Sequence, residues 1–304
     1  MRNRLQYRVA EHSVVVYSAY PERISKMLSG FGSFLVSADN TEPFLQFYIE
    51  SKNSEPEESS KEGEFTTVHT FDLEQDCCRL SRQGSRYLFT IEEREGGSPI
   101  ELTMEIGSPR VRCRLKPDYK HDQIILPNLT HLKFSLWMAM AFEGIPRRFT
   151  PVHSSVIVYN NQAIMFLGEA GTGKSTHTKL WLQHIPGSVL LNDDSPILRI
   201  EAGKPYVYGS PWSGKGRCYV NEKYPVKAFV RLKQHPHNKI DRLNKLESFG
   251  ALYPSFPPAY LKDEYLEEHI CTIISKVITS TPVYLLHCLP NQEAAEMVME
   301  TIYK

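Results

Sequence analysis

The residues best able to do chemistry in this sequence of 304 residues lie together in one short segment rich in glycine. The segment reads Gly168, Glu169, Ala170, Gly171, Thr172, Gly173, Lys174 and Ser175, and Thr176 follows it. The spacing G-x-x-x-x-G-K-[ST] is that of a P-loop, whose glycines let the backbone wrap phosphate groups. We therefore predict that residues 168–176 bind a nucleoside triphosphate, that Lys174 contacts its β- and γ-phosphates, and that Ser175 ligates Mg²⁺.

The sequence on both sides of this segment favours the same interpretation, because the motif is a strong signal only where a strand precedes it and a helix follows. Residues 163–167 form an apolar run with β-branched and aromatic members, and residues 175–184 have the composition of a helix that ends before Pro186. A helix that begins at the end of the loop directs unpaired N–H groups and a partial positive charge at a bound anion. We expect ATP and Mg²⁺ as the cofactors.

A pair of adjacent carboxylates follows the next predicted strand. Residues 188–192 are a short and mostly apolar run, and Asp193 and Asp194 come directly after it. We expect this strand to lie beside strand 163–167 and parallel to it, with both carboxylates at the C-terminal end, where ligands bind in such sheets. Asp194 would then hold Mg²⁺, and Asp193 would act as the base that takes a proton from an acceptor hydroxyl. Alternatively, one of the two caps a turn before Pro196.

The register of a predicted hairpin gives His153 a place in the site. Residues 156–159 and 163–167 flank Asn160 and Asn161, a pair that suits a type I′ turn. Residue 159 then faces residue 162, and the same register sets His153 opposite Gly168 at the mouth of the loop. An imidazole there could relay a proton or donate to phosphate charge. The alternative is a structural histidine.

A second glycine-rich segment, residues 209–217, carries two cations and a tryptophan. Its glycines permit close backbone approach, and Lys215 and Arg217 could stabilise charge on a transferring phosphoryl group. We predict a catalytic role for Arg217. Trp212 could stack on a ring or exclude water. The alternative is an ordinary surface turn with a buried tryptophan.

The remaining sequence predicts three regions. Residues 1–118 alternate in short β-like runs at 44–49, 65–71, 87–91 and 111–115, which favour an antiparallel meander of unknown role, and the charged run 50–64 between the first two favours a mobile loop. Residues 119–144 are a connecting helical segment whose helix, 129–142, ends at Gly144. Residues 145–304 are the catalytic domain, with further strands at 228–232 and 283–287, a helix at 262–277, and a terminal helix capped by Asn291.

Composition excludes several other classes of protein. Lys plus Arg and Asp plus Glu both total 35, so no overall charge draws the chain to nucleic acid or to an anionic membrane surface. The longest apolar stretch, residues 136–142, falls far short of the roughly 18 residues that a membrane span needs. The six cysteines form no C-x-x-C pair and no signal peptide is evident, which favours a reduced, cytoplasmic protein. His235 and His237 fit an exposed loop better than a metal site.

Residues 145–304 resemble the catalytic domain of the HPr kinase/phosphorylase family, which shares its P-loop core with phosphoenolpyruvate carboxykinases. The resemblance rests on His153, on residues 168–175, on Asp193 and Asp194, and on a closing pattern at 282–286 and 291–295. It implies an α/β P-loop core with a mixed sheet, in which His153 and Asp193 handle the acceptor proton and Ser175 helps to bind metal. That family phosphorylates a serine on a carrier protein, and its relatives act on ribosomal peptides or small molecules. The family usually carries a glutamate in the segment that corresponds to residues 209–217, and this sequence has none there.

The sequence therefore predicts an ATP- and Mg²⁺-dependent kinase whose acceptor is a hydroxyl of a protein, a peptide or a metabolite. Whether the chain forms a homo-oligomer stays open. One alternative is a nucleotide-binding switch without an acceptor, because Asn244-Lys-Leu-Glu247 approximates the guanine-reading N-K-x-D pattern. A further alternative is an enzyme like phosphoenolpyruvate carboxykinase, which would need a cationic pocket around Lys215 and Arg217.

Overall fold

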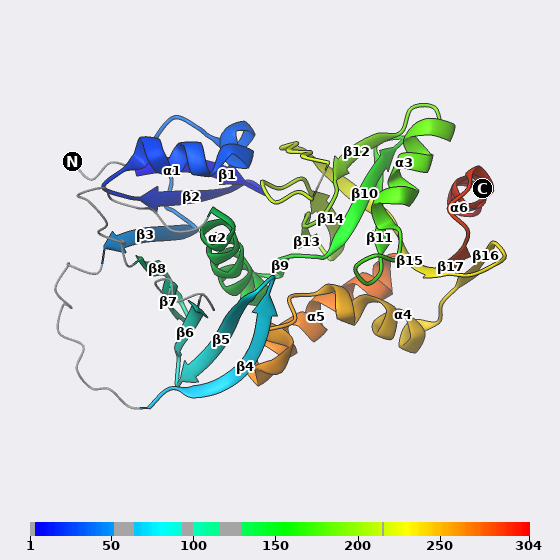
Figure 1. The fold of residues 1–304 in the computed structure, drawn as a ribbon. Helices are drawn as coiled ribbons and strands as arrows, with labels where there is room; N and C mark the ends of the chain where they lie inside the picture. Colours follow the sequence, from blue (N-terminus) through cyan, green and yellow to red (C-terminus); the bar gives the residue numbers. More distant parts are fainter. Residues whose placement is uncertain (1–3, 52–63, 93–99, 116–128, 215) are drawn as a thin grey trace. The chain divides into compact units, whose positions relative to one another are not determined.

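The computed structural model describes residues 4–51, 64–92, 100–115, 129–214 and 216–304. The chain divides into two compact units, Met1–Glu143 and Gly144–Lys304 (Figure 1). Both combine a mixed β-sheet with helices. In the parts of the chain that the structure describes, no helix is both long and apolar enough to cross a membrane.

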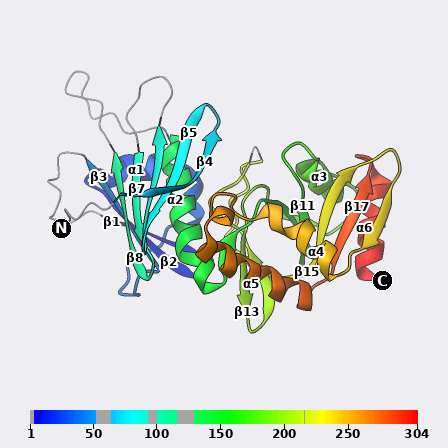
Figure 2. The ribbon, with the colours of Figure 1, turned by 90° about the horizontal axis from the view of Figure 1, so that it is seen from below.

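The first unit is built on one sheet with the strand order β1-β2-β3-β8-β7-β6-β5-β4. Its strands are β1 (Arg4–Val9), β2 (His12–Tyr17), β3 (Leu45–Ser51), β4 (Thr66–Leu73), β5 (Asp76–Gln83), β6 (Arg86–Glu92), β7 (Ile100–Glu105) and β8 (Ser108–Leu115). Helix α2 (Leu129–Gly144) packs on one face through Phe134, which meets Phe71 and Phe89 edge to face, and through Phe142, which meets Tyr87 (Figure 2). The predicted helix and its end at Gly144 are confirmed.

The predicted antiparallel meander is correct for β1 and β2 and from β4 to β8, and β3 departs from it. Strand β3 pairs in parallel with β2 on one side and with β8 on the other. The reason lies between β2 and β3. There, helix α1 (Pro21–Met27) and the 3₁₀ segment η1 (Ser29–Phe34) return the chain to the end of the sheet at which β2 begins. Such a crossover makes the following strand parallel, whereas a tight turn would make it antiparallel. The predicted loop 50–64 lies mostly outside the described residues.

The second unit contains a mixed sheet in the order β12-β10-β11-β15-β14-β13-β9, with β17 beside β15 and β16 beside β17. Its strands are β9 (Phe149–Pro151), β10 (Ser154–Tyr159), β11 (Gln162–Leu167), β12 (Val189–Asn192), β13 (Ile197–Glu201), β14 (Lys204–Tyr208), β15 (Lys223–Gln234), β16 (Lys239–Arg242) and β17 (Val283–Cys288). Its α-helices are α3 (Lys174–His184), α4 (Lys245–Leu252), α5 (Glu264–Ser280) and α6 (Gln292–Tyr303), and its 3₁₀ segments are η2 (Ile145–Arg147), η3 (Tyr253–Ser255) and η4 (Tyr260–Lys262). The strands and helices expected after residue 228 are therefore present, including the cap at Asn291, whose side chain accepts from the Ala294 N–H.

The hairpin of β10 and β11 has the predicted register. Asn160 and Asn161 both have positive φ angles, 50° and 57°, as a type I′ turn requires. Tyr159 pairs with Gln162, and the ladder continues to Ser154 and Leu167. It stops there, one pair before His153 and Gly168, because the His153 N–H donates to the Ser255 carbonyl at 2.8 Å instead.

Strand β12 runs in the predicted direction but has a different neighbour. It pairs antiparallel with β10, which pairs antiparallel with β11, so β12 and β11 point the same way with β10 between them. The hairpin already occupies the edge of β11 that β12 was expected to take, and β15 fills the other edge as a parallel partner. The C-terminal ends of β11 and β12 still lie at the same end of the sheet, and that end carries the loop 168–173 and Asp193.

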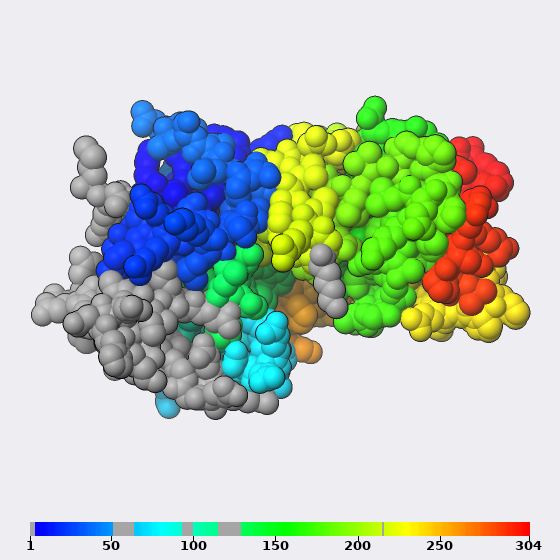
Figure 3. All heavy atoms as spheres, turned by 45° about the horizontal axis from the view of Figure 1, so that its top comes forward, coloured from blue at the N-terminus to red at the C-terminus, as the bar shows by residue number. Residues whose placement is uncertain are grey.

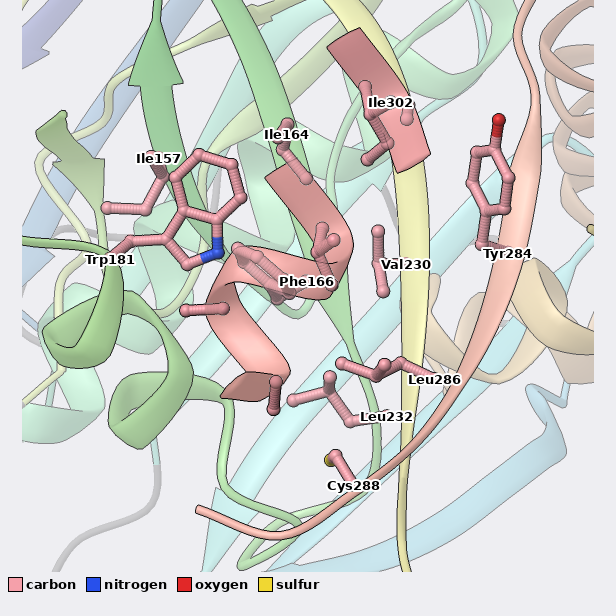
Figure 4. Packing of buried hydrophobic residues seen from close by; sticks show 14 of the residues in the cluster. Ile157, Ile164, Phe166, Trp181, Val230, Leu232, Tyr284, Leu286, Cys288 and Ile302 are labelled. Carbon is pink, nitrogen blue, oxygen red and sulfur yellow. The ribbon is translucent and has the colours of Figure 1, made fainter. Parts of the chain in front are cut away.

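A cluster of buried apolar residues packs α3 against the sheet. Trp181 of α3 packs against Phe166 and Ile157 of the sheet, and α6 adds Val298 and Ile302 (Figure 4). Each large side chain buried in this way contributes about 1.5–3 kcal/mol to folding. In the space-filling view, the C-terminal residues in red lie directly against the green surface to which α3 and β10 belong (Figure 3), and the Tyr303 hydroxyl donates to the Tyr159 carbonyl at 3.0 Å. Helix α3 therefore packs against the sheet and shares its apolar cluster with α6.

His177, in the first turns of α3, makes the stability of this unit depend on pH. Its side chain is buried, its Nε2 lies 3.1 Å from the Cys288 Sγ, and its Nδ1 has no hydrogen-bond partner within the described part of the chain. Burial lowers the pKa of His177 from 6.5 to about 4. Between these two values the unfolded chain binds a proton that the folded chain does not, so stability falls as the pH falls.

We expect the free energy of unfolding to drop by about 2 kcal/mol between pH 7 and pH 5 on account of His177 alone. Urea unfolding of the wild type and of His177→Gln at both pH values checks this. The glutamine variant loses one buried imidazole and should show a smaller change between the two pH values. Equal changes in the two proteins would contradict the assignment.

Candidate functional site

The loop between β11 and α3 follows a path that requires glycine. Gly168, Gly171 and Gly173 have φ angles of 153°, 80° and 105°, which residues with a side chain rarely adopt. At Gly168 there is also no room, since a Cβ would lie 2.4 Å from the Thr172 Oγ1. The predicted strand before the loop and the predicted helix after it are both confirmed.

Helix α3 differs from the other α-helices of the second unit in how it begins. Helices α4, α5 and α6 start with side-chain caps from Asn244, Asp263 and Asn291. Helix α3 starts after Gly173 with no side-chain cap. The N–H groups of a first helical turn have no partner inside the helix, so an uncapped start offers donors and a partial positive charge to an anion.

Lys174 is the first residue of α3, and its side chain turns back over the loop. Its Nζ donates to the carbonyl of Gly168 at 2.7 Å and to that of Glu169 at 3.1 Å. Burial lowers the pKa of Lys174, and the negative charges of Asp194 and Glu169 act in the opposite direction. The ammonium group is therefore partly desolvated and close to the acidic residues of the site.

Two side chains of β15 hold the outer half of the loop. The Arg231 Nη2 lies 2.6 Å from the Glu169 Oε1, and its Nη1 donates to the Ala251 carbonyl at 3.0 Å. The Gln234 Nε2 donates to the Gly171 carbonyl at 3.2 Å. The sequence analysis missed both residues, because only the parallel pairing of β15 with β11 brings them to the loop. Of the predicted nucleotide-binding residues, Glu169, Ala170 and Thr176 are exposed, and Thr172 donates from its Oγ1 to the Glu169 carbonyl at 2.8 Å.

Asp193 is held by a buried serine. The Ser155 Oγ donates to the Asp193 Oδ1 at 2.7 Å and lies 3.2 Å from the Thr178 Oγ1 of α3. Thr178 in turn donates to the Ser175 carbonyl at 3.1 Å. A series of close polar contacts thus leads from Asp193 to the first turn of α3. The sequence carried one signal for it, since Ser154 and Ser155 are two polar residues at the start of an otherwise apolar strand.

Asp194 is the carboxylate that His153 faces. The His153 Nδ1 lies 3.4 Å from the Asp194 Oδ1, and the two side chains are 45% and 39% exposed. The backbone reinforces the arrangement, because the Ser154 N–H donates to the Asp194 carbonyl at 3.0 Å. The imidazole thus points toward the acidic pair and away from the core, and its partner there is Asp194.

Asn192 shapes the turn that presents both carboxylates. Its Oδ1 accepts from the N–H groups of Asp194 and Ser195, both at 3.0 Å, and its Nδ2 donates to the Trp212 carbonyl at 3.0 Å. Asn192 is fully buried. The backbone N–H groups of the turn before Pro196 are therefore capped by Asn192 and not by either aspartate, although the Ser195 Oγ lies 3.4 Å from the Asp194 Oδ2.

The second glycine-rich segment covers Asp193 with its backbone. A Cβ on Gly214 would lie 2.9 Å from the Asp193 carbonyl oxygen, and one on Gly216 would lie 3.2 Å from the Asp193 Oδ2. Trp212 is buried, as the alternative interpretation of this segment expected. The Arg217 side chain is exposed, and its backbone N–H donates to the Gly214 carbonyl at 3.2 Å. Lys215 lies outside the described residues.

The candidate metal ligands of this site are oxygen-bearing side chains. Within the described residues, no group of three or more His, Cys, Asp or Glu side chains is arranged to hold a metal ion. Mg²⁺ is commonly bound by one or two protein oxygens together with substrate phosphates and water, so a full cage of protein ligands is not required. Ser175, Asp194 and Asp193 supply the oxygen donors that this ion prefers. His235 and His237 lie in an exposed segment after β15.

Comparisons with known proteins add little to this description. No protein-family model matches the chain, and none of the curated proteins matches it. Among solved structures, the chain is similar to the Hpr(Ser) kinase/phosphatase from Coxiella burnetii, with 15% sequence identity and a TM-score of 0.29. That similarity covers 51% of this chain and 88% of the other. A likeness of this size identifies neither fold nor activity.

Proposed function

We propose that the second unit is a P-loop kinase, which binds Mg·ATP and transfers the γ-phosphoryl group to a hydroxyl. The observation that carries the proposal is the junction of β11, the loop 168–173 and α3, where a glycine loop leads into an uncapped helix. Asp193 is tied to the same helix through Ser155 and Thr178. The proposal therefore places phosphate-binding donors and a carboxylate base at the same end of the sheet, which suits phosphoryl transfer because its catalysis rests on positioning and electrostatics.

Each residue has a defined role in this proposal. The loop N–H groups and Lys174 hold the β- and γ-phosphates, for which Lys174 exchanges its contacts to the Gly168 and Glu169 carbonyls. Ser175 and Asp194 are the residues that would hold Mg²⁺, which neutralises charge on the phosphates when it is bound. Asp193 accepts the proton of the attacking hydroxyl. Ser155 occupies the Asp193 Oδ1, so the Oδ2 beneath Gly216 is the atom that remains for this proton.

The two alternatives from the sequence have no observation in their favour. Asn244 and Glu247 form a capping box at the start of α4, in which each side chain accepts from the other residue's N–H. This capping role accounts for Asn244 and Glu247, so their resemblance to a guanine-reading motif needs no bound nucleotide to explain it. The cationic pocket of a carboxykinase would depend on Lys215 and Arg217, and the Arg217 side chain is exposed. The acceptor class remains a hydroxyl of a protein, a peptide or a small molecule.

Calorimetry with nucleotides tests the binding half of the proposal. Mg·ATP should bind to the full chain with a dissociation constant in the micromolar range or below, which corresponds to about 8 kcal/mol. GTP serves as the competing ligand, because a guanine-specific switch would prefer it. If no nucleoside triphosphate binds at millimolar concentration, the proposed function is wrong.

His153 is expected to contribute to catalysis and little to binding. It faces Asp194 at 3.4 Å from an exposed position, where it can donate to the phosphoryl group or pass on a proton. Removal of an acid–base group typically lowers a rate by about 10²- to 10⁴-fold. His153→Ala should reduce kcat within this range and leave the KM for ATP nearly unchanged. His237→Ala, in an exposed segment after β15, is the matched control, and a kcat of His153→Ala equal to that of the control would remove His153 from the mechanism.

Ser155 is expected to act through Asp193. Loss of a hydrogen bond to a charged group costs about 1.5–3 kcal/mol, so Ser155→Ala should lower kcat by at least about tenfold with little change in the KM for ATP. Ser155→Thr keeps the hydroxyl and should recover most of the rate. Ser154→Ala is a close control, because that buried hydroxyl donates to the Val152 carbonyl and not to a carboxylate. Equal rates for Ser155→Ala and Ser154→Ala would show that Ser155 does not position Asp193.

A further inference from the structure

A cavity of about 470 Å³ lies on the outer side of the loop 168–173. It is lined by loop residues 169–172, by residues 231–234 at the C-terminal end of β15, and by Leu285 of β17. Sites for small molecules commonly have volumes of about 300–1,000 Å³ and are mostly apolar with a few polar groups. The cavity therefore has the size of a ligand site, and it shares Gly171 and Thr172 with the proposed phosphate loop.

The sheet order decides which end of a nucleotide lies on this side. Strands β10 and β12 flank β11 on one side, and β15 and β17 flank it on the other. His153 precedes β10, and Asp193 and Asp194 follow β12, so the reacting groups are all on the first side. The γ-phosphate must point there. The loop follows β11 and lies between the two sides. If the triphosphate runs along the loop, its α-phosphate, which carries the nucleoside, points toward β15 and β17.

The lining of the cavity suits a flat and mostly apolar group. Leu285 is half-buried and presents a fixed apolar surface, and the long stem of Lys233 adds to it. The Leu232 side chain belongs to the buried core cluster and does not add to this surface. Polar groups lie at the rim of the loop. The Gln234 amide is already oriented by its bond to the Gly171 carbonyl, and the Glu169 carboxylate, paired with Arg231, can accept from sugar hydroxyls.

An acceptor molecule fits this cavity less well. The hydroxyl that attacks the γ-phosphate has to reach the Asp193 Oδ2, which lies beneath Gly216 on the other side of β11.

We propose that the cavity formed by residues 169–172, residues 231–234 and Leu285 binds the nucleoside part of the nucleotide, with the base against Leu285 and Lys233. This inference rests on the proposed function, because it assigns the second half of the same ligand.

Filling the cavity should weaken the binding of the nucleoside without weakening the binding of the phosphates. Lys233→Trp and Leu285→Trp each place an indole in the proposed base site, and Lys233 is exposed, so its replacement should not disturb the core. Lys239→Trp, on an exposed position of β16 outside the cavity, is the control. Calorimetry of the full chain measures the binding of Mg·ATP and of inorganic tripolyphosphate with Mg²⁺, the latter being a probe that has phosphates and no nucleoside.

We expect both cavity variants to bind Mg·ATP at least tenfold more weakly than the control, with tripolyphosphate affinity unchanged within twofold. Unchanged ATP affinity in Lys233→Trp would overturn the inference, and so would an equal loss for both ligands, since the cavity would then not distinguish nucleoside from phosphate. Failure of the wild type to bind either ligand would instead refute the proposed function, and the inference with it.

Discussion

Replacement of Lys174 by alanine is expected to abolish phosphoryl transfer and to weaken ATP binding by at least about tenfold. Hydrogen bonds to charged groups contribute about 1.5–3 kcal/mol each, and every 1.4 kcal/mol changes an affinity tenfold. Within the described residues, the Lys174 ammonium donates to the backbone carbonyls of Gly168 and Glu169 and to no other residue's side chain, so its removal takes away little packing. The variant should therefore fold and unfold like the wild type.

The control for this prediction is Lys179→Ala, an exposed lysine on the same helix. ATP affinity is measured by calorimetry, transfer by the release of the γ-phosphoryl group, and folding by thermal unfolding. Lys174→Ala should lose binding and transfer while Lys179→Ala keeps both. A folded Lys174→Ala protein with the ATP turnover of the wild type would contradict the assignment of residues 168–175 as a phosphate loop.

Replacement of Asp193 by asparagine is expected to lower the rate by about 10²- to 10⁴-fold, the usual cost of losing a general base. The amide has the shape of the carboxylate, and its oxygen can still accept from the Ser155 hydroxyl, so the position of the side chain should not change. Mg·ATP binding should therefore remain close to that of the wild type. The effect belongs to kcat, because an amide cannot take up the proton of the acceptor.

The variant Asp194→Asn distinguishes the role of Asp194 from that of Asp193. Asp194 is the proposed metal ligand, so this variant should raise the Mg²⁺ concentration needed for half-maximal activity, whereas Asp193→Asn should not. Titration of activity with Mg²⁺ on both variants measures the difference. Rates near that of the wild type in both variants would show that neither carboxylate takes part in the reaction.

Local patterns in the sequence were sufficient for the elements that position the loop. The type I′ pair Asn160 and Asn161 fixed the register of β10 and β11, because a two-residue turn leaves only one pairing. The apolar run before Gly168 and the helical composition after Ser175 gave the strand and the helix in the same way. Local rules work here because each depends on residues that are close together in the chain.

The partners of Asp193 depend on contacts between distant segments and could not be predicted. Ser155 reaches Asp193 only because β10 lies between β11 and β12, whereas the sequence predicts β12 directly beside β11. Gly214 and Gly216 pack on Asp193 because Asn192 ties the turn to the Trp212 carbonyl. The mixed sheet of the first unit has a similar cause, since the crossover through α1 determines the direction of β3. Nothing in the spacing of these residues indicates such neighbours.

The central claim, transfer of a γ-phosphoryl group by the second unit, is tested most directly with two labelled nucleotides. The full chain is incubated with cell extract and Mg²⁺, and with ATP that carries ³²P either at the γ-position or at the α-position. The products are then sorted by size into protein, peptide and metabolite. We predict label in one product class with γ-labelled ATP, none with α-labelled ATP, and none in either case with Lys174→Ala. If the wild-type protein binds ATP but labels no product, the chain is a nucleotide-binding module and not a kinase.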